Sequence, residues 1–171
     1  MQFLITAMGR SGTKSIAEYL RCPHELGNGL SSLILTMDRY RREGLDYGEC
    51  SSYHRRIAPY CLGVRKAYIH RHPHHIALSG MARGHSVRET ANGLAELYMS
   101  IDKDKEASVF YFEDLILDAT PLARWAERRA SGALPQCNES VPGSKEGITL
   151  SECDKNFLEP FLKTRDFTYT A

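Results

Sequence analysis

Gly9-Arg10-Ser11-Gly12-Thr13-Lys14-Ser15 decides the fold of this chain because of what lies on each side of it. The apolar residues 3–8 before it have the length of a β-strand, and in residues 16–20 after it apolar side chains recur at helical spacing. The glycines let the backbone pass close to an oxyanion, and the first helical N–H groups and the helix dipole point toward it. Arg10 and Lys14 add positive charge. The stretch therefore predicts a phosphate- or sulfate-bearing ligand at the first turn of an α/β sheet.

The same loop leaves two other interpretations open. The Walker pattern of ATP-binding loops places a Gly directly before Lys-Ser, and here Thr13 takes that place. This disfavours a small-molecule kinase with a P-loop, although Lys14-Ser15 keeps it as an alternative. In a purely structural interpretation, Gly9 and Gly12 shape a tight strand-to-helix turn, and Ser11 or Thr13 caps the helix.

A second strand-to-helix segment carries a complementary pair of polar side chains. Residues 65–70 form a predicted strand, and Pro73 fits the first turn of the helix that follows. Arg71 stands at the strand end and Ser79 lies eight residues further on. A planar guanidinium from the strand end and a hydroxyl from the helix can therefore converge on one anion.

These two segments together resemble the nucleotide-dependent sulfotransferases. That family pairs a strand-loop-helix of the form (Arg/Lys)-Ser-Gly-Thr with a later Arg-x-Pro and a Ser at this spacing. Its first loop binds the 5′-phosphosulfate of PAPS (3′-phosphoadenosine 5′-phosphosulfate), and its later Arg and Ser bind the 3′-phosphate. The resemblance implies PAPS as co-substrate and PAP as product, with Arg71 and Ser79 at the 3′ end. The residues that it places at the 5′ end are Arg10, Ser11, Gly12, Thr13, Lys14 and Ser15.

Other segments agree with the resemblance, and some depart from it. Residues 110–115 look like the (Tyr/Phe)-Glu-Asp-Leu strand end of the family, in which Glu113 and Asp114 are expected to brace the loop through backbone N–H groups. Asn138-Glu139-Ser140 with residues 148–150 resembles the C-terminal part of its shorter bacterial-type members. The Lys-x-x-His and Arg-Lys-Gly elements of members acting on phenols and steroids are missing. The resemblance therefore leaves the acceptor unidentified.

Sulfuryl transfer to a hydroxyl or amine needs cations that steady the leaving phosphate, here Arg10 and Lys14, and a base that takes the acceptor's proton. The segment after the first helix resembles the His-Glu segment of the shorter members. In carbohydrate and tyrosine sulfotransferases, a Glu in a comparable place acts as the base. Glu25 is therefore the first candidate, with His24 and His54 as alternatives because imidazoles titrate near neutral pH. Glu25 has a second interpretation, as a loop carboxylate that pairs with a site arginine and orders the pocket.

Composition bounds the remaining possibilities. The 171 residues suit a single sulfotransferase-like domain, 1–171, and the net charge of +1 favours neither nucleic acid nor an anionic membrane as partner. Residues 3–8 are too few for a membrane span and lack the features of a signal peptide. The five cysteines include no CxxC pair, which favours reduced thiols in a cytoplasmic compartment. The histidines of residues 70–75 lack nearby Cys or carboxylate ligands, so no metal is expected.

Alternating strands and helices predict an α/β fold with three layers, P-loop-like, in which helices flank a central parallel sheet. Strands are expected at residues 2–8, 47–50, 66–70 and 109–112. Helices are expected at residues 14–21, 30–42, 52–60, 73–83, 87–102, 121–130 and 150–162, with Pro160 bending or ending the last one. A loop is expected at residues 132–147. Three hypotheses follow: a sulfotransferase that uses PAPS and a small-molecule or carbohydrate-type acceptor, a P-loop kinase, or a non-catalytic nucleotide-binding protein.

Overall fold

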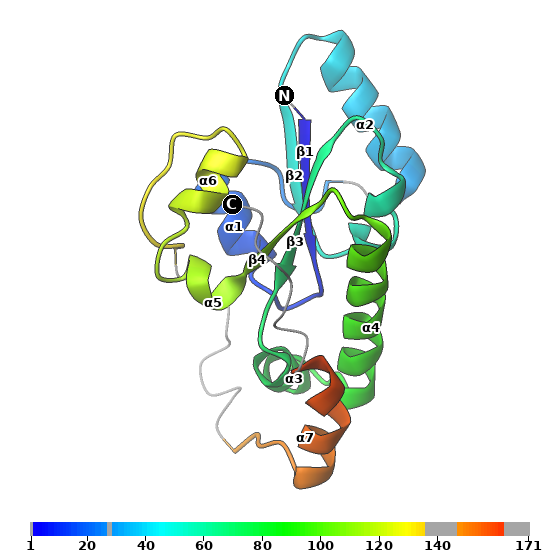
Figure 1. Ribbon diagram of the computed structural model, residues 1–171, viewed down its shortest axis with the longest axis vertical. Helices are drawn as coiled ribbons and strands as arrows, with labels where there is room; N and C mark the ends of the chain where they lie inside the picture. Colours follow the sequence, from blue (N-terminus) through cyan, green and yellow to red (C-terminus); the bar gives the residue numbers. More distant parts are fainter. Residues whose placement is uncertain (1, 27–28, 136–146, 163–171) are drawn as a thin grey trace.

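The computed structural model describes residues 2–26, 29–135 and 147–162, in which four strands form one parallel sheet of order β2-β1-β3-β4 (Figure 1). β1 (Gln2–Ala7) lies between β2 (Tyr47–Ser51) and β3 (Arg65–His70), and β4 (Ser108–Tyr111) pairs with β3. Each strand ends within one residue of its predicted limits. The predicted α/β fold with a central parallel sheet is confirmed.

The helices connect and cover these strands. The helix predicted at residues 30–42 is confirmed, and so is the helix predicted at residues 87–102, which starts with a capping box between Ser86 and Glu89. The helices in the described part of the chain are α1 (Thr13–Leu20), α2 (Leu30–Arg42), α3 (Pro73–Met81), α4 (Val87–Lys103), α5 (Phe112–Leu115), α6 (Thr120–Trp125) and α7 (Glu152–Leu158).

Three predictions of secondary structure were wrong. The helix predicted at residues 52–60 is two 3-10 turns, η1 (His54–Arg56) and η2 (Ala58–Tyr60), because Pro59 lacks the N–H that a continuous helix needs. The helix predicted at 121–130 ends at Trp125, and α5 starts where a strand end was expected. The last helix gives way to a 3-10 turn, η3 (Glu159–Phe161), at Pro160, as predicted.

Both faces of the sheet are covered, and β1 shows how its sequence achieves this. Phe3, Ile5 and Ala7 belong to a core shared with α1 and α6, whereas Leu4 belongs to a core shared with α2 and α4. Figure 1 shows α1 and α6 on one side of the sheet and α4 on the other. Because both faces are buried, the strand is an almost continuous apolar run, as is usual in parallel sheets. Trp125 packs edge-on against Phe3 with ring centroids 5.9 Å apart.

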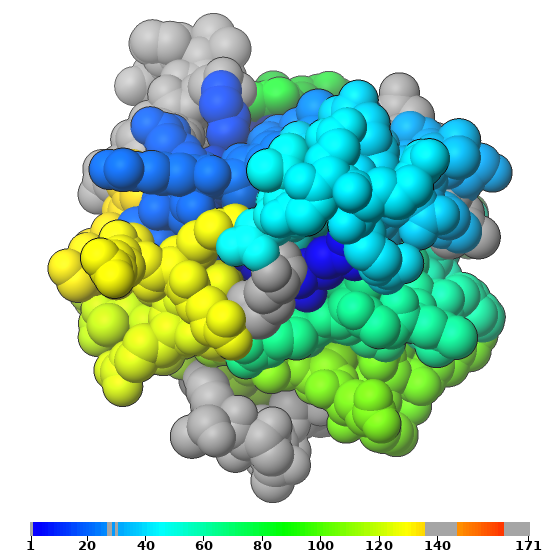
Figure 2. Space-filling model, turned by 90° about the horizontal axis from the view of Figure 1, so that it is seen from above, coloured from blue at the N-terminus to red at the C-terminus, as the bar shows by residue number. Residues whose placement is uncertain are grey.

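The two ends of the sheet differ in what covers them. Below the carboxyl ends of the strands in Figure 1, α3, α4 and α7 share a third apolar core that includes Ile76, Leu94 and Leu158. Figure 2 views the other end, where β1 is visible between the α2 region and the α6 region. No helix in the described ranges is both long and apolar enough to cross a bilayer. Asn138-Glu139-Ser140 and most of the loop predicted at 132–147 lie outside the described residues.

Gly12 packs so closely against Phe112 that the loop after β1 and the start of α5 fix one another. Gly12 has a φ of 79°, in the left-handed region, and a Cβ atom built there would overlap the Phe112 ring. The glycine is therefore required twice, by its backbone conformation and by the close approach of the ring.

Replacing Gly12 should therefore cost more than backbone strain alone. Gly63 offers a matched control, because its φ is 69° and nothing lies within 4 Å of a Cβ built there. We expect Gly63→Ala to lower the free energy of unfolding by about 1–2 kcal/mol, and Gly12→Ala by a further 1–3 kcal/mol or so because of the clash. Urea denaturation of both variants measures the difference. Equal losses of unfolding free energy in the two variants would show that the Phe112 ring moves aside at no energetic cost.

Candidate functional site

A cavity of ≈ 800 Å³ lies at the carboxyl edge of the sheet. Its walls come from the loop after β1, the segment after α1, the end of β2 and helix α3. In a parallel sheet the residues that follow each strand meet at this edge, where ligands bind in open α/β sheets. The predicted site residues that the cavity brings together are Arg10, Gly12, Thr13, Lys14, Ser15, His24, Glu25, Arg71 and Ser79.

The start of α1 forms one wall and is suited to an anion. Its N-cap residue, Gly12, provides no side-chain cap, and the first turn contains no acidic residue. The first backbone N–H groups of a helix have no partner within the helix, and its dipole places partial positive charge there. Lys14 is exposed in this turn and adds a full charge. The loop therefore presents amides and a cation toward the cavity.

Ser11 does not share this wall. It is completely buried, its Oγ has no hydrogen-bond partner among the described residues, and it does not line the cavity. The Ser11 N–H donates to the carbonyl of Met8 at 3.2 Å, which closes a turn and directs the residue beneath the loop. The structure therefore does not bring the Ser11 side chain to the place predicted for the 5′ end.

Two arginines from different strand ends meet at the other wall. Arg10 has a left-handed φ of 72°, and its Nε donates to Ser79 Oγ at 3.1 Å. Arg71 Nη1 donates to the carbonyl oxygen of Arg10 at 2.6 Å, and Arg71 Nε is buried without a hydrogen-bond partner in the described part of the chain. The sequence placed Arg10 at one end of the ligand and Arg71 with Ser79 at the other. The structure joins all three in one network.

The electrostatics of Arg71 favour an anionic ligand. Burial lowers the pKa of its guanidinium, and the neighbouring Arg10 lowers this pKa further, whereas Glu113 raises it. The net direction is downward, so the attraction of Glu113 does not outweigh desolvation. A bound phosphate or sulfate would compensate both guanidiniums, since charge-assisted contacts with arginine are the strong ones.

The segment after β4 braces this network. Glu113 Oε1 accepts a hydrogen bond from the His72 N–H at 2.9 Å and lies 3.4 Å from His75 Nδ1, at the start of α3. The bracing role predicted for Glu113 is confirmed. The Phe112 ring lies 4.8 Å from the Arg71 guanidinium carbon and also contacts Gly12. Phe112 lines the cavity, and sequence reasoning missed it because the residue was assigned to a strand.

The candidate bases His24 and Glu25 stand at the α1 side of the cavity. His24 Nε2 lies 3.1 Å from Thr13 Oγ1 and 3.8 Å from Glu25 Oε1. Glu25 Oε1 accepts hydrogen bonds from the Ser52 hydroxyl at 2.5 Å and from the Ser52 N–H at 3.3 Å. Glu25 also has a φ of 57°, a backbone strain of the kind that concentrates at functional sites. The segment thus connects the anion loop to the end of β2.

His54 lies elsewhere. It is completely buried, its Nδ1 is 3.5 Å from Glu49 Oε1, and it does not line the cavity. The 3-10 turn that replaces the predicted helix directs this side chain inward. The structure therefore leaves His24 and Glu25 as the candidate bases.

Other polar residues reach the cavity without having been predicted. Arg83 and His85 both donate their backbone N–H to the Gly80 carbonyl, at 2.8 and 3.1 Å, so the turn after α3 brings them to the wall that carries Ser79. The signal was present in the sequence, because Arg83 follows Ser79 by four residues and such residues share a helix face. Ser52 could have been found as the polar residue directly after β2.

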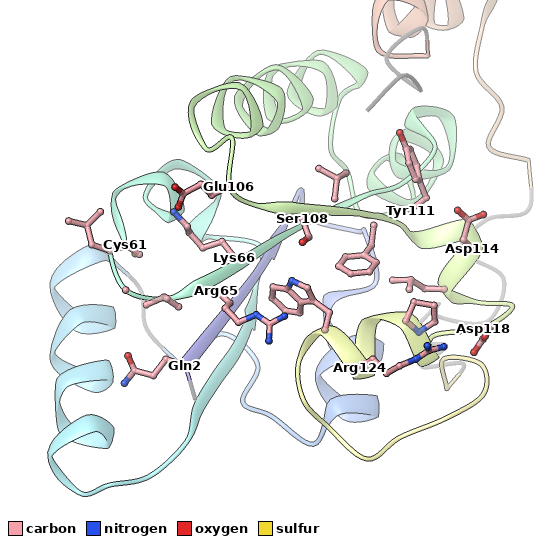
Figure 3. Close-up of a pocket in the computed structure, with 18 residues that line it drawn as sticks. Gln2, Cys61, Arg65, Lys66, Glu106, Ser108, Tyr111, Asp114, Asp118 and Arg124 are labelled. Carbon is pink, nitrogen blue, oxygen red and sulfur yellow. The ribbon is translucent and has the colours of Figure 1, made fainter. Parts of the chain in front are cut away.

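A larger cavity of ≈ 1340 Å³ follows the edge of β4 (Figure 3), and the two cations at the start of β3 that line it are paired with carboxylates. Arg65 lies 3.0 Å from Glu127 and stacks on Trp125 at 5.2 Å, and Lys66 lies 2.8 Å from Asp104. These two cations begin β3, so they lie at the amino ends of the strands. The candidate site is therefore the smaller cavity.

The described residues contain no group of three or more metal-binding side chains that could hold a metal ion. The histidines near the start of α3 instead pack on one another, with ring centroids of His72 and His74 5.1 Å apart. The residues of the site are thus equipped to hold an anion through cations, hydroxyls and amides.

No protein-family model and no curated protein sequence matches this chain. Among solved structures, it is similar to the crystal structure of a sulfotransferase from Alicyclobacillus acidocaldarius, with a TM-score of 0.55 and 15% sequence identity. The alignment covers 94% of this chain and 90% of that chain. At this identity the likeness defines the fold, which is a sulfotransferase-like α/β fold.

The geometry predicts that a small polyanion stabilises the fold through Arg10. We expect inorganic pyrophosphate at about ten times its Kd to raise the melting temperature by about 3–6 °C. In Arg10→Ala the rise at the same concentration should fall to less than half. Arg42→Ala removes the same charge from the exposed end of α2 and serves as the control. An equal rise in melting temperature in Arg10→Ala and Arg42→Ala would show that Arg10 does not contribute to anion binding.

Proposed function

We propose that this protein transfers a sulfuryl group from PAPS to a hydroxyl or amine of a small-molecule or carbohydrate-type acceptor. The observation that carries the proposal is the network of Arg71, Arg10 and Ser79 beside the uncapped start of α1. In this proposal the network and the start of α1 serve as two anion subsites in one cavity, one for the 3′-phosphate and one for the 5′-phosphosulfate of the nucleotide. The likeness in fold to a solved sulfotransferase supports the same interpretation.

In this proposal the two walls of the cavity hold the two ends of PAPS. The amides of the first turn of α1 and Lys14 bind the 5′-phosphosulfate. Arg71, Ser79 and Arg83 bind the 3′-phosphate. Arg10 lies between the two ends, bonded to Ser79 on one side and belonging to the anion loop on the other. The cavity of ≈ 800 Å³ is in the size range of nucleotide and small-molecule sites.

The transfer step needs a base beside the anion loop. The acceptor oxygen or nitrogen attacks sulfur, its proton goes to the base, and the bond between sulfur and the 5′-phosphate oxygen breaks to leave PAP. Lys14 and the loop amides stabilise the charge that develops on the leaving phosphate. Glu25 is the proposed base. His24 links Glu25 to Thr13 of the loop, with contacts of 3.8 and 3.1 Å, and is the alternative.

The 3′-phosphate subsite can be tested by binding alone. We expect PAP to bind more tightly than AMP, because only PAP engages Arg71 and Ser79. Arg71→Ala should weaken PAP binding at least tenfold, which corresponds to about 1.4 kcal/mol or more for a buried charge-assisted contact. Arg65→Ala, at the start of β3, whose end Arg71 follows, removes an exposed arginine and should leave PAP binding unchanged.

Isothermal titration calorimetry of PAP, AMP and ATP with Mg²⁺ measures these affinities. Equal affinity of the unsubstituted protein for PAP and AMP would contradict the 3′-phosphate subsite. ATP binding that exceeds PAP binding and requires Mg²⁺ would favour the kinase. Tight PAP binding with no release of PAP from PAPS, with any hydroxyl or amine acceptor, would favour a non-catalytic nucleotide-binding protein.

The base can be assigned by two variants that keep shape and remove proton acceptance. Glu25→Gln should lower the rate of PAP release from PAPS, in a mixture of hydroxyl and amine acceptors, by roughly 10²–10⁴-fold. PAP affinity should change less than about twofold. Glu18→Gln on the exposed face of α1 is the matched control.

Three outcomes distinguish the possible roles of Glu25 and His24. Loss of rate in Glu25→Gln with PAP binding kept identifies Glu25 as the base. Loss of rate in His24→Gln, with Glu25→Gln active, moves that role to His24. Loss of PAP binding in Glu25→Gln shows that this carboxylate orders the pocket instead.

A further inference from the structure

Two cysteines distant in the sequence lie side by side next to the candidate bases. Cys22 follows α1 and Cys50 lies within β2, yet their sulfur atoms are 3.7 Å apart. Cys50 is completely buried, and Cys22 is partly exposed. The Cys22 thiol can therefore contact a solute, whereas the Cys50 thiol is reached only through Cys22.

The backbone around the pair ties it to the site. The Cys50 N–H donates to the Pro23 carbonyl at 3.0 Å, and the Glu25 N–H donates to the Cys50 carbonyl at 3.1 Å. His24 pairs with Cys50 as an isolated parallel bridge. The segment from Cys22 to Glu25 thus lies along the edge of β2, with the two sulfur atoms at its beginning.

The surroundings give the two thiols different chemistry. Burial raises the pKa of Cys50 well above the usual thiol value, and the nearby Cys22 and Glu49 raise it further. Contact with the Cys50 thiol lowers the pKa of Cys22, and Arg128 lowers it slightly, whereas burial and Glu49 oppose this. Cys22 is therefore both the more exposed thiol and the one whose surroundings favour the thiolate, so it is the thiol that reacts first.

We propose that Cys22 and Cys50 form an oxidative modification site for hydrogen peroxide, which converts the pair to a reversible disulfide. The Cys22 thiolate attacks one peroxide oxygen, the O–O bond breaks, and Cys22 becomes a sulfenic acid; the released hydroxide takes up the proton that Cys22 lost on ionising and becomes the first water. The Cys50 sulfur then attacks the Cys22 sulfur. The S–O bond breaks, and the departing hydroxide takes the Cys50 proton to leave as water. Two thiols and one peroxide thus give one disulfide and two waters.

The disulfide would change the segment that carries His24 and Glu25. A disulfide joins sulfurs about 2.05 Å apart, so the pair must close from the present 3.7 Å. Cys50 is fixed within β2 between its hydrogen-bonded neighbours, and the movement therefore falls on Cys22 and the residues after it. Oxidation of this pair is expected to shift the candidate bases relative to Thr13. This consequence rests on the proposed function, whereas the modification itself does not.

The experiment treats the full chain with hydrogen peroxide, blocks remaining thiols by alkylation, and maps the products by mass spectrometry without reduction. We expect two of the five thiols to disappear, with one peptide that links Cys22 to Cys50, and both thiols to return with dithiothreitol. In Cys22→Ser this linked peptide and the associated thiol loss should vanish. Cys153→Ser removes an exposed cysteine and should leave the link unchanged.

Other products would overturn the proposal. Sulfinic acid on Cys22 without a linked peptide would show that Cys50 does not resolve the intermediate. Oxidation of Cys153 with Cys22 and Cys50 both still reduced would show that the pair is not reactive. The unsubstituted chain decides both points, so the result does not depend on a variant that folds poorly. If the Cys22–Cys50 disulfide forms but no PAP is released from PAPS, the modification site is supported and the proposed function is contradicted.

Discussion

The hydrogen bond from the Arg71 guanidinium to the Arg10 carbonyl, 2.6 Å long, is the contact on which the site depends. It joins the ends of β3 and β1, which are neighbours in the sheet but lie more than fifty residues apart in the chain. The Phe112 ring, which follows β4, lies against this guanidinium and against Gly12. Three strand ends therefore position one another, and Arg10 and Gly12 both have a left-handed backbone conformation at this junction.

The parallel sheet explains why these residues meet. Each strand ends at the same edge, so a polar residue directly after β1, β3 or β4 reaches a common space. The order β2-β1-β3-β4 places the end of β1 at the centre, with β2 on its other side. Ser52, directly after β2, holds the Glu25 carboxylate at this second side. The two flanks of β1 thus provide different chemistry, guanidiniums on one and a carboxylate with an imidazole on the other.

The sequence predicted what local pattern and strand order determine. An apolar run predicted β1, the alternation of strands and helices predicted the parallel sheet, and Arg10 and Arg71 both follow predicted strands. Prediction from the sequence was wrong where tertiary packing determines the direction in which a side chain points. Ser11 turns beneath the loop because its N–H closes a turn with Met8, and His54 turns inward on a 3-10 helix that Pro59 imposes. Phe112 was missed because its contact with Gly12 depends on two segments about a hundred residues apart.

The partners of the cations explain why the smaller cavity is the one suited to a ligand. Along the β4 edge, Arg65 and Lys66 face carboxylates at 3.0 and 2.8 Å, so their charge is compensated within the protein. In the site, Arg10 Nε donates to the Ser79 hydroxyl and Arg71 Nη1 donates to the Arg10 carbonyl, and both of these acceptors are neutral groups. Burial lowers the pKa of Arg71 despite Glu113, which is the mark of a charge held at a cost in desolvation. A chain of net charge +1 exerts no strong general attraction on anions, so binding of a polyanionic ligand would depend on local cations such as Arg10 and Arg71.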